Sequence, residues 1–180
     1  MKTTALMVMM VTAGQMARAE QPQYKLAVYL HDNASVPPTV RLPAMRMAAE
    51  MFATIGIRLD WRTGEPHRTS SERPILIDLA TRTPANLVPG ALAYALPYEG
   101  VHIRVFYDRI QRQIAPGLTT AFLAHVLVHE ITHVLQRIER HSDSGIMQAV
   151  WTDRDYLQMR MGSLPFAPED VLLIQLGLAK

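Results

Sequence analysis

Residues 121–135, AFLAHVLVHEITHVL, decide how this chain folds. Apart from a few polar positions the segment is apolar all round, which is typical of a helix buried in a core. Its polar residues are His125, His129, Glu130, Thr132 and His133. Burying three imidazoles and a carboxylate is costly unless something binds them. The segment therefore predicts a buried helix that carries a functional site.

Residues 129–133 read His-Glu-Ile-Thr-His, and this spacing predicts a metal site. Residues four apart on a helix lie on one face, so both imidazoles can bind one cation. Glu130 lies about 100° round the helix from His129, where its carboxylate can reach a metal-bound water without binding the metal. Zinc would lower the pKa of that water to about 7, and Glu130 would move its proton to the leaving amine. We therefore expect peptide-bond hydrolysis, with His129 and His133 as Zn²⁺ ligands and Glu130 as general base.

A catalytic zinc site normally has a third protein ligand beside its water. The chain contains no cysteine, so this ligand must be a histidine, aspartate or glutamate. His141 is the preferred candidate, because imidazole suits zinc and the chain becomes polar after residue 136, where it can turn back under the metal. Acidic rivals remain open, and these are Glu139, Asp143, Asp153, Asp155 and Glu169.

The other histidines are expected to be structural. His125 shares the helical stripe but lies about 12 Å along the axis from His133, too far for all to meet one ion. It is expected to support the ligands or simply to pack. His31, His67 and His102 are scattered over predicted strands and loops.

The rest of the pattern predicts an α+β fold. β-forming residues bounded by Gly and Pro predict strands at 24–30, 57–61, 75–79, 91–95 and 101–107. Apolar residues at three- and four-residue steps predict a helix over 40–55 that ends at Gly56. No repeat or linker divides the chain. We expect one domain over residues 20–180, with a mixed sheet of about five strands, a backing helix, the active-site helix and a C-terminal helix.

Residues 1–19 have the pattern of a signal peptide. Lys2 precedes an uncharged apolar run over 4–14, and Ala17-Arg18-Ala19 fits the small-x-small cleavage pattern. The run is too short to span about 30 Å of hydrocarbon at about 1.5 Å per residue. We therefore expect cleavage near Ala19, a secreted or periplasmic protein, and no stable membrane anchor.

Charge gives mostly negative information. The net charge is +2, from 18 basic and 16 acidic residues, and no polybasic run appears. A nucleic-acid partner is therefore not expected. We expect a polypeptide substrate and a monomeric protein.

The residues around the motif resemble the metzincin metallopeptidases. The resemblance rests on 129–133, on His141-Ser142 and on Ser144-Gly145-Ile146-Met147, which is similar to the family's methionine-containing turn. It implies that His129, His133 and His141 are the ligands, that Glu130 is the base and that Met147 lies beneath the metal.

The resemblance extends to the elements around the site. It implies that the strand 91–95, which includes Ala93 and Tyr94, forms the upper rim of the cleft and pairs with extended substrate. Residues 168–175 are similar to the closing helix of the matrixin branch. Trp151 and Tyr156 are further candidates for a substrate pocket, although such aromatic residues more often pack in a core.

The chain also departs from the family pattern. Gln136 stands at the place of the family's glycine, Glu139 at the place of its third histidine, and His141 comes two residues late. Without that glycine the helix is free to run on before it turns. The departures keep a second hypothesis open, in which the protein is a metal-stabilised peptide-binding protein without turnover. Glu130 favours the enzyme, since a purely structural site has no need of a base. Hydrolysis of a non-peptide amide, as in cell-wall processing, is a third hypothesis.

Overall fold

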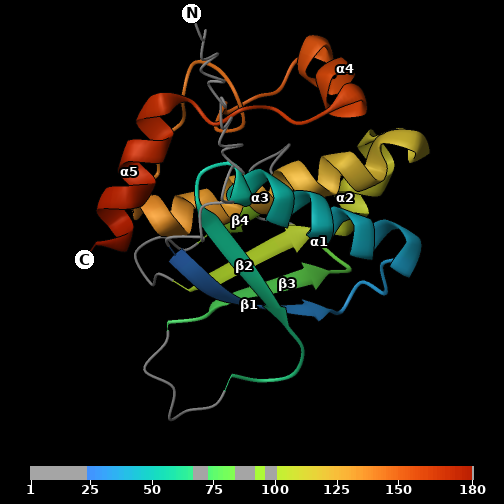
Figure 1. Cartoon of the computed structure of the whole chain (residues 1–180). Helices are drawn as coiled ribbons and strands as arrows, with labels where there is room; N and C mark the ends of the chain where they lie inside the picture. The colour runs from blue at the N-terminus through green and yellow to red at the C-terminus, as the bar shows by residue number, and fades with distance from the viewer. Residues whose placement is uncertain (1–23, 67–72, 84–91, 96–100, 180) are drawn as a thin grey trace, which may run out of the picture.

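The computed structural model describes residues 24–66, 73–83, 92–95 and 101–179 (Figure 1). The predicted signal segment, His67 and Ala91 lie outside these ranges. The strands are β1 (Tyr24–Asp32), β2 (Ile57–Arg62), β3 (Ile75–Ala80), β4 (Ala93–Ala95) and β5 (His102–Phe106). The helices are α1 (Pro38–Ala53), α2 (Tyr107–Gln113), the 3-10 turn η1 (Pro116–Leu118), α3 (Thr119–Gln136), α4 (Asp153–Met161) and α5 (Pro168–Leu178).

The strands form one mixed sheet in the order β2-β1-β3-β5-β4. All neighbours are parallel except β4, which runs antiparallel to β5. Parallel strands need a crossover connection, and α1 supplies it between β1 and β2. Within the described part of the chain, β4 is an edge strand with one side unpaired. The predicted α+β fold with a five-stranded mixed sheet is confirmed.

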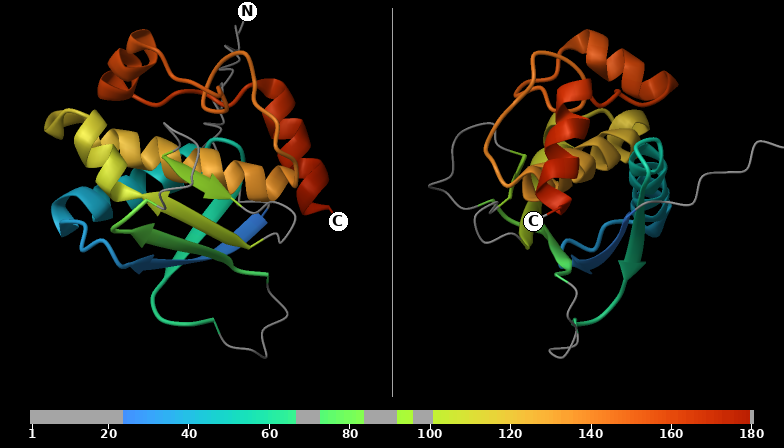
Figure 2. Two further views of the ribbon diagram at one scale, coloured as in Figure 1. Left: turned by 180° about the vertical axis from the view of Figure 1, so that it is seen from behind. Right: turned by 60° about the vertical axis from the view of Figure 1, so that its left-hand side comes forward.

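Helices α1 and α3 pack together over one face of the sheet, and the C-terminal segment with α4 and α5 lies beyond α3 (Figures 1 and 2). Alternation in β3 buries Ile75, Ile77 and Leu79. The buried face of α1 includes Ala48 and Phe52, four residues apart. Core side chains therefore pack against α3 on several sides. This packing fixes the position of the helix that carries the predicted site.

Sixteen of the eighteen residues of α3 are buried, as its composition predicts. Residues 116–136 form the one helix, among the described residues, that is long and apolar enough to cross a membrane. However, 89% of its most apolar window is buried inside the fold, which is typical of a core helix. Helices α2 and α4 are not among the elements that the sequence pattern predicts. A capping box between Thr152 and Asp155 at the start of α4 was the available signal.

Candidate metal centre

The structure brings His129, His133 and His141 together. One ring nitrogen from each lies within 4.8 Å of the other two. His129 and His133 project from α3, whereas His141 comes from the loop that follows the helix. The group contains none of the acidic rivals, all of which are among the described residues. The two-residue displacement of the third histidine does not prevent it from reaching the helix pair.

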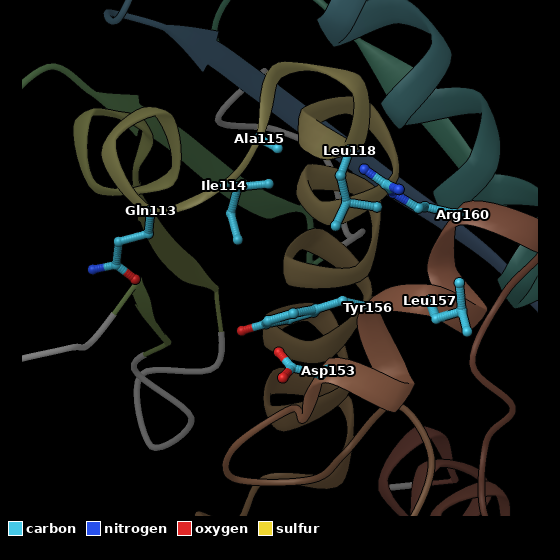
Figure 3. A pocket seen from close by; sticks show the side chains of 8 residues that line it. All are labelled: Gln113, Ile114, Ala115, Leu118, Asp153, Tyr156, Leu157 and Arg160. Carbon is cyan, nitrogen blue, oxygen red and sulfur yellow. The ribbon is translucent and has the colours of Figure 1, made fainter.

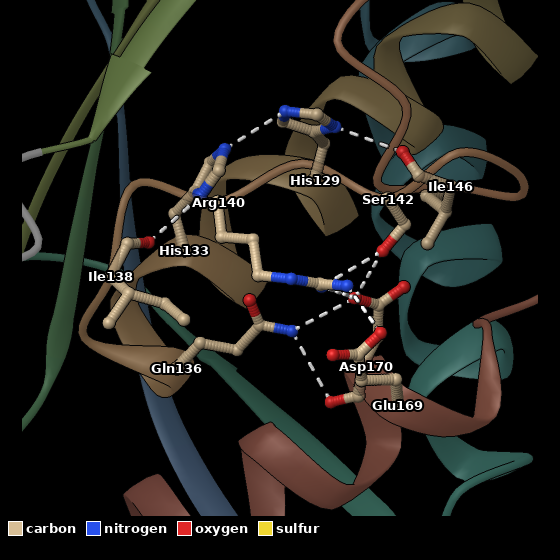
Figure 4. Close-up of polar contacts among 9 residues, drawn as sticks. All are labelled: His129, His133, Gln136, Ile138, Arg140, Ser142, Ile146, Glu169 and Asp170. Carbon is tan, nitrogen blue, oxygen red and sulfur yellow. Dashed lines mark hydrogen bonds and ion pairs between the residues drawn. The ribbon is translucent and has the colours of Figure 1, made fainter.

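Hydrogen bonds fix which nitrogens face the centre (Figure 4). His129 Nδ1 lies 2.9 Å from the carbonyl oxygen of Ile146, and His133 Nδ1 lies 3.2 Å from that of Ile138. A carbonyl only accepts, so each Nδ1 carries the proton and each Nε2 keeps its lone pair. The two Nε2 atoms are 3.1 Å apart. Two nitrogens on a tetrahedral zinc ion, at about 2.0–2.1 Å from it, are separated by about 3.3 Å.

The three imidazoles are held in the neutral form that binds metal. Burial, together with the neighbouring His133, lowers the pKa of His129 to about 3. Burial also lowers the pKa of His133 and of His141. Two unprotonated Nε2 lone pairs at contact distance repel unless a cation lies between them. The donor set therefore fits a divalent metal ion such as Zn²⁺.

Glu130 follows His129 directly on α3 and is buried, with 8% of its surface exposed. Burial raises the pKa of its carboxyl group to about 8, while a hydrogen bond from the backbone N–H of Ala95 opposes this. Phe106 N–H donates to Leu92 O, so in the antiparallel ladder Ala93 and Ala95 turn their N–H and C=O groups to the outer side. The Glu130 carboxyl group thus reaches the free edge of β4.

The segment Ser142–Met147 forms a closed turn against the ligands. Ser142 N–H donates to Met147 O at 2.8 Å, and Ile146 N–H donates to Pro165 O at 2.9 Å. Gly145 has φ +79°, and a Cβ there would lie 2.4 Å from the Pro165 carbonyl oxygen. Only glycine fits this position. Met147 is fully buried, and the residue before it accepts the His129 hydrogen bond.

Helix α3 ends at Gln136 and does not run on. Arg137 takes the left-handed conformation at φ 57°, a position where glycine is more usual. The Gln136 side chain is buried and donates to the backbone carbonyl and the carboxylate of Asp170. The expectation of a longer helix was wrong, because this residue ties the end of α3 to α5. The local sequence pattern does not single out Asp170; its signal is an acid that shares the buried face of a largely apolar helix with Ile174 and Gly177.

Aromatic side chains lead from the histidines to a pocket, and Figure 3 shows the residues that line it. Trp151 lies edge-on to His129 with ring centroids 5.6 Å apart. Phe122 contacts both Trp151 at 5.4 Å and Tyr156 at 5.6 Å. Tyr156 lines the pocket, of about 310 Å³, whereas Trp151 does not. The lining residues are Gln113, Ile114, Ala115, Leu118, Asp153, Tyr156, Leu157 and Arg160.

The remaining described histidines have other roles. His125 Nδ1 donates to Ala121 O at 2.6 Å, and its Nε2 accepts from Leu164 N–H at 3.0 Å. Both nitrogens are used within the protein, so none is left for a metal. His31 bonds the Gly64 carbonyl, and His102 is exposed on β5.

Comparisons with known proteins support the fold. No protein-family model and no curated protein sequence matches the chain. Among solved structures, it is similar to an archaemetzincin from Methanopyrus kandleri, with a TM-score of 0.59 and 14% identity over 87% of this chain and 96% of that one. It is also similar to a zinc-dependent peptidase from Methanocorpusculum labreanum, with a TM-score of 0.58 and 11% identity over 82% of this chain and 99% of that one. At these identities the likeness establishes the fold.

Proposed function

We propose that this protein is an exported, zinc-dependent endopeptidase. The observation that carries the proposal is the convergence of His129, His133 and His141 on one point, with the buried Glu130 directly after His129 on α3. A structural zinc site has no need of a carboxyl group in that position. The two similar solved structures are described as an archaemetzincin and a zinc-dependent peptidase, which agrees with this reading.

In this proposal, three residues bind the metal and a fourth transfers the proton. A bound zinc ion would acidify a water molecule and polarise the scissile carbonyl. His129, His133 and His141 would hold the ion, each through a ring nitrogen. A cation bound beside Glu130 would favour its ionised carboxylate, which would then accept a proton from the attacking water and donate it to the leaving amine. Its carboxyl group is already oriented by the Ala95 N–H before any substrate binds.

The substrate is an extended polypeptide that pairs with the outer edge of β4. Ala93 turns both its backbone N–H and C=O away from β5, and no described strand covers them. An extended chain added to such an edge gains main-chain hydrogen bonds without needing a particular side chain. Because Glu130 binds the same edge at Ala95, a peptide paired there lies next to the base.

The pocket beside Tyr156 would receive one substrate side chain. It is two side chains from His129, through Phe122 and Trp151. The apolar walls from Ile114, Leu118 and Leu157 favour an apolar guest, while Asp153 and Arg160 bring charges to the lining.

Export is proposed from the sequence alone. Lys2, the apolar run over 4–14 and Ala17-Arg18-Ala19 support cleavage near Ala19. The N-terminal sequence of protein recovered outside the cytoplasm tests this point. A chain that still begins at Met1 would contradict it.

The decisive experiment compares the wild type with Glu130→Gln, using an unstructured protein as substrate and one equivalent of zinc. Gln keeps the shape of the side chain but cannot take up the proton. We expect hydrolysis to fall by roughly 10²–10⁴-fold while zinc content stays at the wild-type level. Equal hydrolysis by both proteins would overturn the role of Glu130. Zinc binding with no hydrolysis by the wild type would favour the peptide-binding protein.

A further inference from the structure

The third histidine is held differently from the other two. His129 and His133 are buried on α3, whereas His141 is exposed and lies between helices, in a stretch without regular secondary structure. Its ring centroid is 5.2 Å from that of His129 and 5.0 Å from that of His133. Among the described residues, no hydrogen bond to its own ring orients it. Something else must therefore hold its backbone in place.

Both neighbours of His141 in the sequence are tied to one buried carboxylate (Figure 4). Arg140 donates to Asp170 Oδ1 at 3.1 Å, and the Ser142 hydroxyl donates to the same oxygen at 2.7 Å. Arg140 also donates to Ser142 Oγ at 3.1 Å, which closes a small ring of contacts. The side chains on either side of His141 are both tied to Asp170, which restrains the backbone between them.

Asp170 is suited to serve as this anchor. It has 0% of its surface exposed and lies in the first turn of α5, where the helix dipole stabilises a negative charge. Arg140 neutralises part of that charge and in turn pairs with the exposed Glu169 at 2.5 Å. Charge-assisted hydrogen bonds in a buried place are stronger and more rigid than those at the surface.

The same carboxylate also receives the end of α3. Gln136 donates to Asp170 Oδ1 at 3.4 Å and to its backbone oxygen at 3.3 Å. Gln136 stands where the metzincin pattern has glycine, and His141 stands two residues late. The segment from Gln136 to Ser142 contains these departures from the family pattern. Asp170 binds both ends of this segment.

We propose that Asp170 is the positioning residue for the third metal ligand, because it binds Gln136, Arg140 and Ser142 and so closes the lengthened turn that presents His141. The inference rests on the proposed zinc site. It goes beyond that site by assigning the placement of His141 to a residue of α5 that touches neither metal nor substrate.

The test is a double-mutant cycle on metal affinity. Zinc dissociation constants are measured for the wild type, Asp170→Asn, His141→Ala and the double variant, by competition with a chelator. Residues that orient metal ligands typically contribute about 10–100-fold to affinity. We expect Asp170→Asn to weaken binding about tenfold in the wild type but to have little effect once His141 is absent, because a residue that acts through His141 has nothing left to position. Equal losses in both backgrounds would overturn the proposal, since they indicate general destabilisation.

Two further measurements separate the possible failures. Cobalt(II) absorption reports the ligand set, so the spectrum of Asp170→Asn should shift toward that of His141→Ala if the third nitrogen is lost. Ser142→Ala removes one hydrogen bond to Asp170 from the loop and should cause a smaller shift in the same direction. This variant keeps the test usable if Asp170→Asn folds poorly.

Glu169→Gln is the matched control, because this exposed acid binds the same Arg140, and it should leave the spectrum unchanged. If His141→Ala itself leaves zinc affinity unchanged, the proposed ligand set fails; if only Asp170→Asn has no effect, the anchor fails.

Discussion

The two halves of the candidate metal centre are built in different ways. His129, Glu130 and His133 lie within five residues on a buried helix, and their relative positions follow from helix geometry. His141 lies on a loop, and its position depends on contacts with α5, about thirty residues further along the chain. The helix half is therefore a local feature of the sequence, whereas the loop half depends on tertiary structure.

This difference predicts unequal effects when ligands are removed from each half. His133→Ala breaks the preorganised pair, and we expect it to remove measurable zinc binding at micromolar protein. His141→Ala keeps the pair, so it should retain weak binding while losing more than the roughly 10–100-fold typical of a supporting residue. Metal analysis after dialysis, followed by chelator competition, measures both. Tighter zinc binding by His133→Ala than by His141→Ala would reverse the assignment of the two halves.

A second prediction concerns the stability that the metal-free protein loses by burying Glu130. The folded chain holds the Glu130 proton up to a pKa of about 8, whereas the unfolded chain loses it near 4.5. Between these values the folded state binds more protons, so its stability falls as pH rises. In metal-free protein, Glu130→Gln should remove this fall and gain stability relative to the wild type by on the order of 3–5 kcal/mol between the two pH limits.

Urea unfolding in the presence of a chelator at several pH values measures this difference. The buried histidines are present in both proteins, so their own pH dependence cancels in the comparison. A stability difference that does not change with pH would show that Glu130 is not held protonated in the metal-free fold.

The loop half can be disturbed without touching any ligand. A Cβ on Gly177 of α5 would lie 1.8 Å from the Leu135 carbonyl oxygen of α3. Gly177→Ala must therefore push α5 away from the end of α3 and move the Asp170 anchor with it. Overpacking of this kind costs about 1–3 kcal/mol, more than the gain of up to about 1 kcal/mol from alanine's helix propensity. Gly117→Ala is the matched control, because a Cβ there meets nothing within 4 Å.

Urea unfolding should show the loss of stability for Gly177→Ala and almost no change for Gly117→Ala. Zinc affinity should fall with the first variant, because the placement of His141 depends on α5. A destabilised protein with wild-type zinc affinity would mean that the loop half is independent of the helix that packs beneath it.

The difference between the helix half and the loop half explains which parts of the site could be predicted from the sequence. The spacing of His129 and His133 within an apolar run predicted both the helix and its shared face, since periodicity and burial agree there. The end of the helix was not predicted, because Gln136 and Arg137 have no intrinsic tendency to stop one. At this end the Gln136 side chain binds Asp170, and no local pattern connects residues 136 and 170. His141 was the preferred third ligand on chemical grounds, but its approach to the pair depended on that same distant contact.

The smallest predicted effect concerns the edge of β4, which belongs to neither half but faces the base. Ala93→Pro removes one N–H that points away from β5, so the sheet loses no hydrogen bond, and proline is tolerated on edge strands. A substrate paired there loses one hydrogen bond, worth about 0.5–1.5 kcal/mol, and KM should rise roughly 3–10-fold with kcat little changed. Ala93→Ser keeps the N–H and should behave like the wild type. If the proline variant instead lowers kcat alone, the edge orients Glu130 through Ala95 and does not bind the substrate.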